Sequence, residues 1–227
     1  LFTFRNDALA PTNPVLSSSS HEPGAWSNLN VIDVSWSGAS DGTGSGVYGY
    51  SYVWSSSPDT LPDTSVDTTG TSASSPPLPD GDGWYFHLRT VDNVGNWTPG
   101  AVHLGPFRLE DIAPTSSVSA LPGSQTAIAF TVSWTGTDLG IASGIAAYDV
   151  QYRIGSGGVW TDWLVGTTAT SATFGPVNPI LLEDGTTYYF RCRAIDHAGN
   201  QEDYPGGDGD AWTTVHLYGT FLPLVQR

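Results

Sequence analysis

The chain has 227 residues, enough for one large domain or two of ordinary size. Its 22 acidic residues outnumber 7 basic ones, and the net charge of −15 argues against partners with phosphate backbones and against anionic membrane surfaces. The 27 glycines and 16 prolines, with only 13% charged residues, disfavour a helical protein because Gly and Pro are the poorest helix formers. We therefore expect many short strands joined by turns.

The first half of the chain recurs in the second half, about one hundred residues further on. Four pairs of blocks correspond: RNDALAPT with RLEDIAPT, VSWSGASD with VSWTGTD, SGVYGYSY with SGIAAYDV, and WYFHLRTVDNVGN with YYFRCRAIDHAGN. The spacing drifts by a few residues between blocks, as loop insertions in a duplicated domain produce. We predict one domain over residues 1–109, with an apolar N-terminal strand, and a second over 110–227, with an apolar C-terminal tail.

Short runs of alternating polarity follow one another within each copy. In the run 31–37, Ile32, Val34 and Trp36 share one face, and in the run 84–91 the inward face holds Trp84, Phe86, Leu88 and Thr90. The run 188–195 repeats the pattern in the second copy. Clusters of Gly, Pro, Asp and Ser separate the runs. About seven short strands per copy predict an all-β fold of two tandem antiparallel β-sandwiches.

Each copy resembles a fibronectin type III domain of the bacterial extracellular kind, a subset of the immunoglobulin-like sandwiches. The resemblance is carried by Trp36 and Trp134, by GYSYVW and AYDVQY, and by LLEDGTTYYFRCRA at the entry to a late strand. It implies that the Tyr188 hydroxyl bonds to the backbone near the preceding turn. Trp84 takes this place in the first copy, and the resemblance does not extend the bond to it.

The motif Asp-x-x-Gly-Asn follows the last long strand run of each copy, at residues 92–96 and 196–200. One interpretation is structural, because Gly supplies a positive φ and the Asp and Asn side chains bond to their own backbone. The other is a Ca²⁺ site, since the resemblance brings three loops to one pole of each sandwich and Ca²⁺ takes six to eight oxygen ligands. The candidate ligands are Asp7, Asp41, Asp92 and Asn96 in the first copy, and Glu110, Asp111, Asp138, Asp196 and Asn200 in the second.

Other kinds of site find little support in the sequence. The five histidines form no HxxxH or HExxH pair for zinc, no serine has a nucleophile-elbow context, and no phosphate-binding glycine loop is present. The single cysteine, Cys192, excludes an intrachain disulfide and is predicted to be a buried, unreactive thiol. No run of 18 apolar residues occurs, so we expect no transmembrane helix and no membrane insertion. We predict that the chain is not an enzyme.

The nine tryptophans have two interpretations. Trp36, Trp84 and Trp134 occupy core positions of strands, whereas Trp26, Trp97, Trp160, Trp163 and Trp212 fall in loops or near strand ends. Exposed tryptophans stack on sugars, so a polysaccharide-binding surface stays open beside packing at the core or its rim. The acidic surface is likewise compatible with divalent cations or with a role in solubility alone.

The two ends of the chain lie outside the repeat and are apolar and β-prone. The chain begins LFTFRND, without Met or a signal peptide, and we expect a mature or excised fragment of a larger protein. Apolar end strands are suited to pairing with the parent protein or with another copy. The sequence thus predicts a secreted or cell-surface bacterial module, non-catalytic and structural or adhesive, which acts as a spacer or as a subunit of a filament or sheath. The alternative is an accessory module of a secreted hydrolase that binds carbohydrate or protein.

Overall fold

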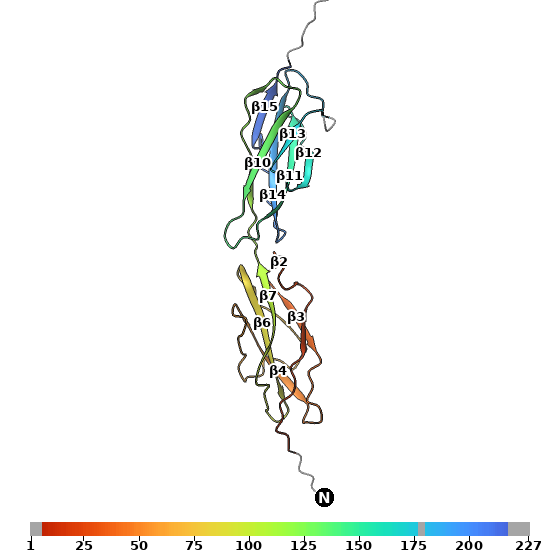
Figure 1. Ribbon diagram of the computed structural model, residues 1–227, viewed down its shortest axis with the longest axis vertical. Coiled ribbons are helices and arrows are strands. Elements are labelled where there is room, and N and C mark those ends of the chain that lie inside the picture. The colour runs from red at the N-terminus through yellow and green to blue at the C-terminus, as the bar shows by residue number, and fades with distance from the viewer. Residues whose placement is uncertain (1–5, 177–179, 218–227) are drawn as a thin grey trace, which may run out of the picture. The chain divides into compact units, whose positions relative to one another are not determined.

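The structure, a computed structural model, describes residues 6–176 and 180–217. The chain divides into two compact units, Leu1–Asp111 and Ile112–Arg227 (Figure 1). No helix in the described residues is long and apolar enough to cross a membrane. The terminal segments 1–5 and 218–227 lie outside the described residues, so their predicted role as assembly strands stays a prediction.

The N-terminal unit consists of two facing sheets. Its strands in the described residues are β1 (Val15–Ser18), β2 (Trp26–Ser27), β3 (Asp33–Ser37), β4 (Val47–Ser55), β5 (Ser72–Ser74), β6 (Gly81–Asp92) and β7 (Val102–Leu109). One sheet has the order β1-β3-β5 and the other β2-β7-β6-β4. Neighbouring strands are antiparallel except β2 and β7, which are parallel.

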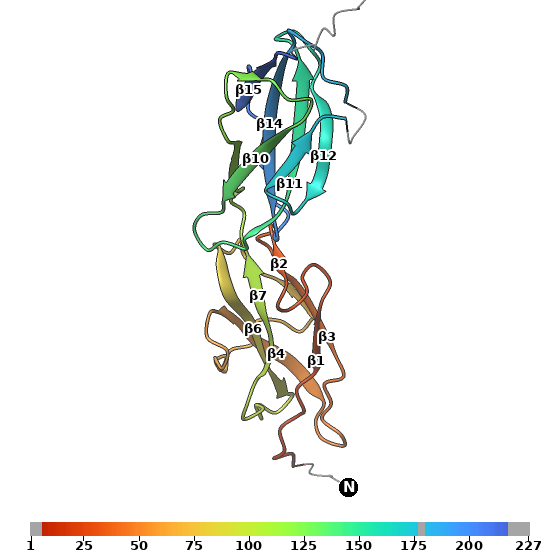
Figure 2. The same ribbon diagram turned by 45° about the horizontal axis from the view of Figure 1, so that its top comes forward.

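The C-terminal unit repeats this plan. Its strands in the described residues are β8 (Thr115–Val118), β9 (Ser124–Gln125), β10 (Phe130–Thr137), β11 (Ile145–Ile154), β12 (Thr161–Thr167), β13 (Ser171–Phe174), β14 (Thr187–Asp196) and β15 (Ala211–Val215). The sheets have the orders β13-β10-β8 and β12-β11-β14-β15-β9 (Figure 2). The short parallel pair is here β9 and β15, and β12 is an additional edge strand.

The two units therefore share one topology, in which the first, second and fifth strands of the fibronectin-type plan oppose a sheet built on the third, sixth and seventh. The prediction of an all-β fold of two tandem, predominantly antiparallel sandwiches is confirmed. Most edge strands are short, with two to four residues, whereas the edge strands β4 and β12 have nine and seven. Short edges limit association with other chains.

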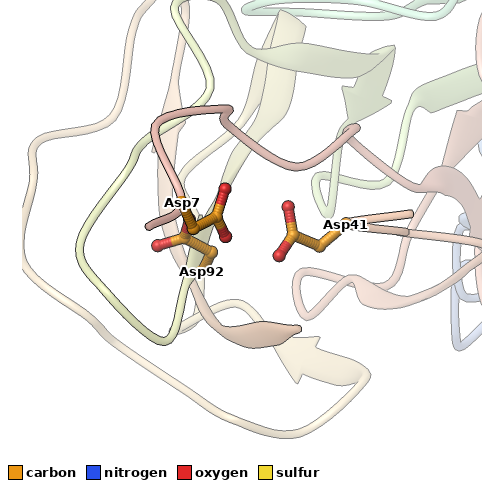
Figure 3. Close-up of side chains that lie close together, drawn as sticks. All are labelled: Asp7, Asp41 and Asp92. Carbon is orange, nitrogen blue, oxygen red and sulfur yellow. The ribbon is translucent and has the colours of Figure 1, made fainter. Parts of the chain in front are cut away.

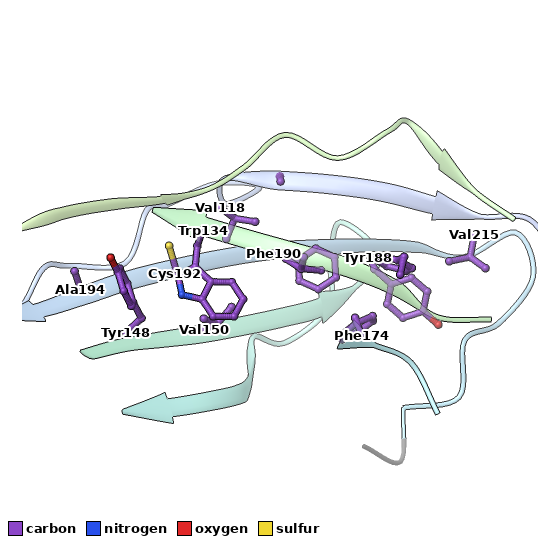
Figure 4. Close-up of a cluster of buried hydrophobic side chains, with 13 residues drawn as sticks. Val118, Trp134, Tyr148, Val150, Phe174, Tyr188, Phe190, Cys192, Ala194 and Val215 are labelled. Carbon is purple, nitrogen blue, oxygen red and sulfur yellow. The ribbon is translucent and has the colours of Figure 1, made fainter. Parts of the chain in front are cut away.

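Alternation along the strands produces the two cores. In β3 the buried residues are Val34 and Trp36, and in β14 every second residue from Tyr188 to Ala194 is fully buried. Trp134 is the largest fully buried side chain and lies at the centre of the C-terminal core, beside Val150 and Cys192 (Figure 4). Each unit thus buries its own apolar cluster, as a self-supporting domain requires.

The turn before the sixth strand of the plan is fixed by a ring in both units. The Tyr188 hydroxyl accepts a hydrogen bond from the Glu183 backbone N–H at 3.0 Å, so the bond implied by the family resemblance is confirmed. In the first unit the Trp84 indole N–H donates to the Pro79 carbonyl oxygen at 3.0 Å. A Cβ at Gly81 would lie 2.8 Å from the Trp84 indole nitrogen, so Gly81 leaves room for this ring. The Trp84 ring donates its hydrogen bond whereas the Tyr188 ring accepts one, but both bonds join the sixth strand to the turn before it.

Two carboxylates complete the pairing of β14, whose neighbour β15 is short. One Asp210 oxygen accepts hydrogen bonds from the backbone N–H groups of Cys192 and Val118, and so connects β14 with β8 of the opposite sheet. A Glu202 oxygen similarly accepts from the Ala194 N–H and the Ser116 hydroxyl. Burial raises the pKa of Asp210. Side chains thus supply acceptors where a longer strand would supply carbonyl groups.

Replacing Tyr188 by Phe should destabilise the C-terminal unit by about 1 kcal/mol, because the Glu183 N–H loses its acceptor while the ring remains in the core. Denaturant unfolding monitored by fluorescence would measure the difference. Tyr189→Phe is the matched control, because that neighbouring hydroxyl makes no hydrogen bond within the described residues. Equal stability of Tyr188→Phe and the unaltered protein would contradict the assigned role.

Candidate functional site

The turn after β6 is organised by the Asp92 carboxylate. One oxygen accepts hydrogen bonds from the backbone N–H groups of Val94 and Asn96 at 2.9 and 2.8 Å, and the other accepts from the Asn96 side-chain amide at 2.7 Å. Gly95 has a φ of 96°, as predicted for this position. Asp92 is only 1% exposed. The structural interpretation of the motif is therefore correct for this turn.

The same carboxylate also takes part in an acidic cluster. Oxygen atoms of Asp7, Asp41 and Asp92 lie within 4.8 Å of one another, and Figure 3 shows Asp7 and Asp41 pointing toward each other with Asp92 beside Asp7. Asp7 precedes β1, Asp41 lies between β3 and β4, and Asp92 ends β6. Three loops far apart in sequence thus meet at one pole of the sandwich, as the sequence predicted for these residues.

The loop before β4 is shaped around these carboxylates. The Ser45 backbone N–H donates to Asp7 at 2.6 Å, and the Gly46 N–H donates to Asp41 at 2.7 Å. A Cβ at Gly44 would lie 2.7 Å from an Asp7 oxygen and would also collide with Asp41. A side chain at position 44 would therefore displace the carboxylate of Asp41 or of Asp7. Beside them is a hollow of about 580 Å³ lined by residues 6–10, Thr12 and 40–44.

Hydrogen bonds favour the ionised forms of two of the three acids. The backbone N–H groups of Ser45 and Leu9 lower the pKa of Asp7. Burial opposes ionisation of Asp92, but its hydrogen bonds from Asn96 and Val94 outweigh burial and lower its pKa. None of the three carboxylates forms an ion pair with a residue of the described part of the chain. The cluster therefore collects negative charge at one pole without a counter-ion among residues 6–176 and 180–217.

The donor set fits a hard cation better than a transition metal. Carboxylate oxygens are ligands that Ca²⁺ prefers, and no imidazole or thiolate belongs to the cluster. Asn96 directs its amide nitrogen at Asp92 and at the Asp7 carbonyl oxygen, so the N–H₂ group, not the amide oxygen, faces these acids. Its structural role is to fix Asp92.

The C-terminal unit repeats part of this arrangement. Asp196 accepts hydrogen bonds from the Asn200 backbone N–H and from its side-chain amide, both at 2.8 Å, and Asp138 accepts from the Gly144 N–H at 2.7 Å. Oxygen atoms of Asp138 and Asp196 lie within 4.8 Å of each other. The second Asp138 oxygen is buried and has no hydrogen-bond partner among the described residues.

The two remaining predicted ligands belong to the other unit. Glu110 and Asp111 end the N-terminal unit, whereas Asp138 and Asp196 lie in the C-terminal one. Glu110 is buried, and its backbone N–H donates to the Ser27 carbonyl oxygen. Asp111 is exposed, and its N–H donates to Asp80 at 3.1 Å. Within its own unit the second cluster thus has two of the predicted carboxylates, and the predicted role of Glu110 and Asp111 as ligands stays a prediction.

The arginines of the described residues all lie over aromatic rings, which the sequence did not suggest. The pairs are Arg89 on Trp97, Arg108 on Trp26, Arg153 on Trp160 and Tyr189, Arg191 on Trp160 and Tyr204, and Arg193 on Tyr204. The last five contacts form a continuous ladder with distances of 4.3 to 4.8 Å. At its end Arg193 pairs with Asp149. These positive charges are buried or half-buried, so the exposed charge of the described chain is acidic.

The same contacts decide between the two interpretations of most tryptophans. Guanidinium groups cover Trp26, Trp97 and Trp160, and Trp163 packs against Trp134 and Phe174 in the core. Trp212 differs, because it is 51% exposed. It borders a small hollow that is also lined by Leu121, Gly123 and Asp210.

No protein-family model matches the chain, and no curated protein matches it either. Among solved structures, it is similar to the crystal structure of the FN1–FN3 domains of chicken CNTN1, with 16% sequence identity and a TM-score of 0.33. The similarity covers 82% of this chain and 64% of the chicken chain, so this chain spans less than two thirds of that structure's length. The sandwich fold rests on the strand order described above.

Cys192 should behave as an inert thiol. Burial raises its pKa to about 12, and its Sγ atom lies 3.4 Å from the Ser116 hydroxyl oxygen. Because the thiolate is the reactive form, we expect a disulfide reagent at pH 8 to modify the native protein at least ~100-fold more slowly than the unfolded chain. A spectrophotometric thiol assay with and without guanidinium chloride would measure both rates. Rapid labelling of one thiol per native chain would contradict this expectation.

Proposed function

We propose that the chain is a non-catalytic structural module of a secreted or cell-surface bacterial protein and that the loop pole of its N-terminal unit binds Ca²⁺. The observation that carries the proposal is the convergence of Asp7, Asp41 and Asp92 within 4.8 Å. Three segments of the chain build that cluster, and Gly44 has no side chain that would occupy the space of the carboxylates. A cation held there joins the segment before β1 to the loops after β3 and β6.

The structural role is supported by the fibronectin-like sandwich, which fits a non-catalytic module, and by the charge distribution. The arginines of the described residues contact aromatic rings and are buried or half-buried, so the exposed charge is mainly acidic. Two copies of the chain therefore repel each other at low ionic strength. Divalent cations relieve such repulsion. The module therefore acts as a spacer when alone and, through its apolar ends, as a subunit of a filament or sheath. Its partners are then other copies or domains of the parent protein.

Calcium binding should stabilise the N-terminal unit. At ~10 mM CaCl₂ a site with a dissociation constant of about 1 mM, typical of extracellular modules, contributes about 1.4 kcal/mol by linkage to the folded state. Asp41→Asn should remove this stabilisation. In EDTA the same variant should be at least as stable as the unaltered protein, because the substitution removes one of three adjacent negative charges.

Scanning calorimetry in EDTA, CaCl₂ and MgCl₂ would test this expectation. Asp82→Asn is the matched control, since it removes one exposed carboxylate outside the cluster. A calcium response of equal size in both variants would assign the effect to general screening and contradict the site. Sedimentation velocity on the same samples would separate the two structural roles, because a subunit of a filament sediments as polymers and a spacer as a monomer.

The alternative, an accessory module that binds polysaccharide beside a secreted hydrolase, is supported by one residue. Trp212 is half-exposed next to a small hollow, and its ring is available for stacking on a sugar. In this case Trp212→Ala should abolish retention of the protein in a gel containing the polysaccharide, whereas Tyr48→Ala, on the other unit, should not. Retention unchanged by Trp212→Ala would exclude this residue as the binding platform.

A further inference from the structure

A pair of histidines lies on the outer face of the sheet that contains β4, β6 and β7. His87 in β6 is directly opposite His103 in β7, and their Nδ1 atoms are 2.6 Å apart. This distance is that of a hydrogen bond, so one nitrogen carries the proton and the other accepts it. The contact therefore requires that at least one of the two rings be uncharged.

His87 is completely buried although the alternation of β6 points it away from the core. The cover is the segment that follows β4, residues 56–62. The His87 Nε2 atom lies 3.0 Å from the Ser55 hydroxyl oxygen, which lies 2.6 Å from that of Thr60. Further along the segment, Arg89 donates to the Pro62 carbonyl oxygen at 3.4 Å. His87 thus connects the covering segment with β7.

The pair can accept one proton but not two without breaking. A singly protonated pair keeps the contact, because a ring that carries hydrogen on both nitrogens still donates through its Nδ1–H to the Nδ1 atom of the other ring. A second proton has to go to that other ring. Both Nδ1 atoms would then be donors, and two positive charges would lie within hydrogen-bond distance of each other.

We propose that the His87–His103 pair is an acid-sensitive clasp, which holds the segment 56–62 on the outer face of the sheet and releases it when both rings are protonated. The sandwich core does not depend on this segment, because the cluster around Trp36, Phe86 and Leu88 lies on the other face of β6. Release uncovers His87 and frees the Arg89 guanidinium group from Pro62. Acidification thereby exposes a positively charged face on an otherwise acidic module.

The groups that face His87 come from three places. His103 comes from β7, Asp59 from the covering segment, and Tyr85 from β6, where its ring is 6.1 Å from that of His87. Burial and the charge of His103 lower the pKa of His87 to about 4, against smaller opposing contributions from Ser57 and Asp59. The closed state therefore binds fewer protons than the open one. Closure is fully favoured above the usual imidazole pKa of about 6.5 and weakens as the pH falls toward 4.

Amide hydrogen exchange followed by NMR would test the clasp in the full chain. After correction for the intrinsic pH dependence of exchange, protection of the amides in residues 56–62 should fall by on the order of a hundredfold between pH 6.5 and pH 4. Amides of β3, on the opposite sheet, should retain their protection. A fall of less than threefold in residues 56–62 would overturn the proposal.

Two variants separate the histidines from the acids of the segment. Asp59 of the segment and Asp63 and Asp67 directly after it carry carboxyl groups, and His87→Gln retains all three while replacing the imidazole ring by a neutral hydrogen-bonding group. In His87→Gln the protection of the amides in residues 56–62 should hardly change between pH 6.5 and pH 4. In His103→Gln it should fall, but by less than in the unaltered protein. A loss in His87→Gln equal to that of the unaltered protein would assign the opening to the carboxylates and overturn the proposal.

Imidazole nitrogen shifts provide a readout that needs no variant. At pH 5 the ¹⁵N spectrum of the unaltered chain should show a neutral His87 ring, because the pKa of His87 is lowered to about 4. Two charged rings with full protection of residues 56–62 would show that double protonation does not open the segment, and would also overturn the proposal.

Discussion

The buried carboxylate at the end of β6 is the interaction on which the loop pole of the N-terminal unit depends. Asp92 has its hydrogen bonds supplied by its own turn, so the fold tolerates an ionised group there. Burying a charge is costly unless it is hydrogen-bonded. Once Asp92 is fixed in this way, Asp7 and Asp41 can approach it only because backbone N–H groups of residues 45 and 46 satisfy them as well. At this pole, therefore, backbone N–H groups hold each of the three carboxylates in place.

Other charged side chains also have partners within the protein. The chain has 7 arginines and no lysine. Each arginine of the described residues lies over an aromatic ring, and Arg191, for example, contacts the face of Trp160 while its guanidinium nitrogens still donate hydrogen bonds. Acidic side chains remain for the surface and for the gaps between strands, where Asp210 and Glu202 act as acceptors. Acidic residues therefore have three uses in this protein, namely solvation, completion of sheets and the loop pole.

The fold and much of the site were predictable from local pattern, but particular contacts were not. The alternation in β3 and β14 predicted the buried faces, and the repeated motif predicted the turns at Asp92 and Asp196. The burial of His87 was not predictable, because the covering segment 56–62 has no pattern that shows where it folds back. The Trp84 bond was missed for a similar reason, since an indole donates where a tyrosine hydroxyl accepts.

The sequence by itself determined that the chain is a duplicated β-sandwich, because period-two alternation and turn residues act between near neighbours in the chain. The family resemblance, in turn, indicated that Asp7, Asp41 and Asp92 lie at one pole of the first sandwich. Only the tertiary structure decided which of them meet, which asparagine atoms face them, and which rings the arginines cover. These contacts join residues separated by dozens of positions, and their geometry depends on how loops close over a sheet, which no local pattern encodes. The pairing of His87 with His103 is of this second kind.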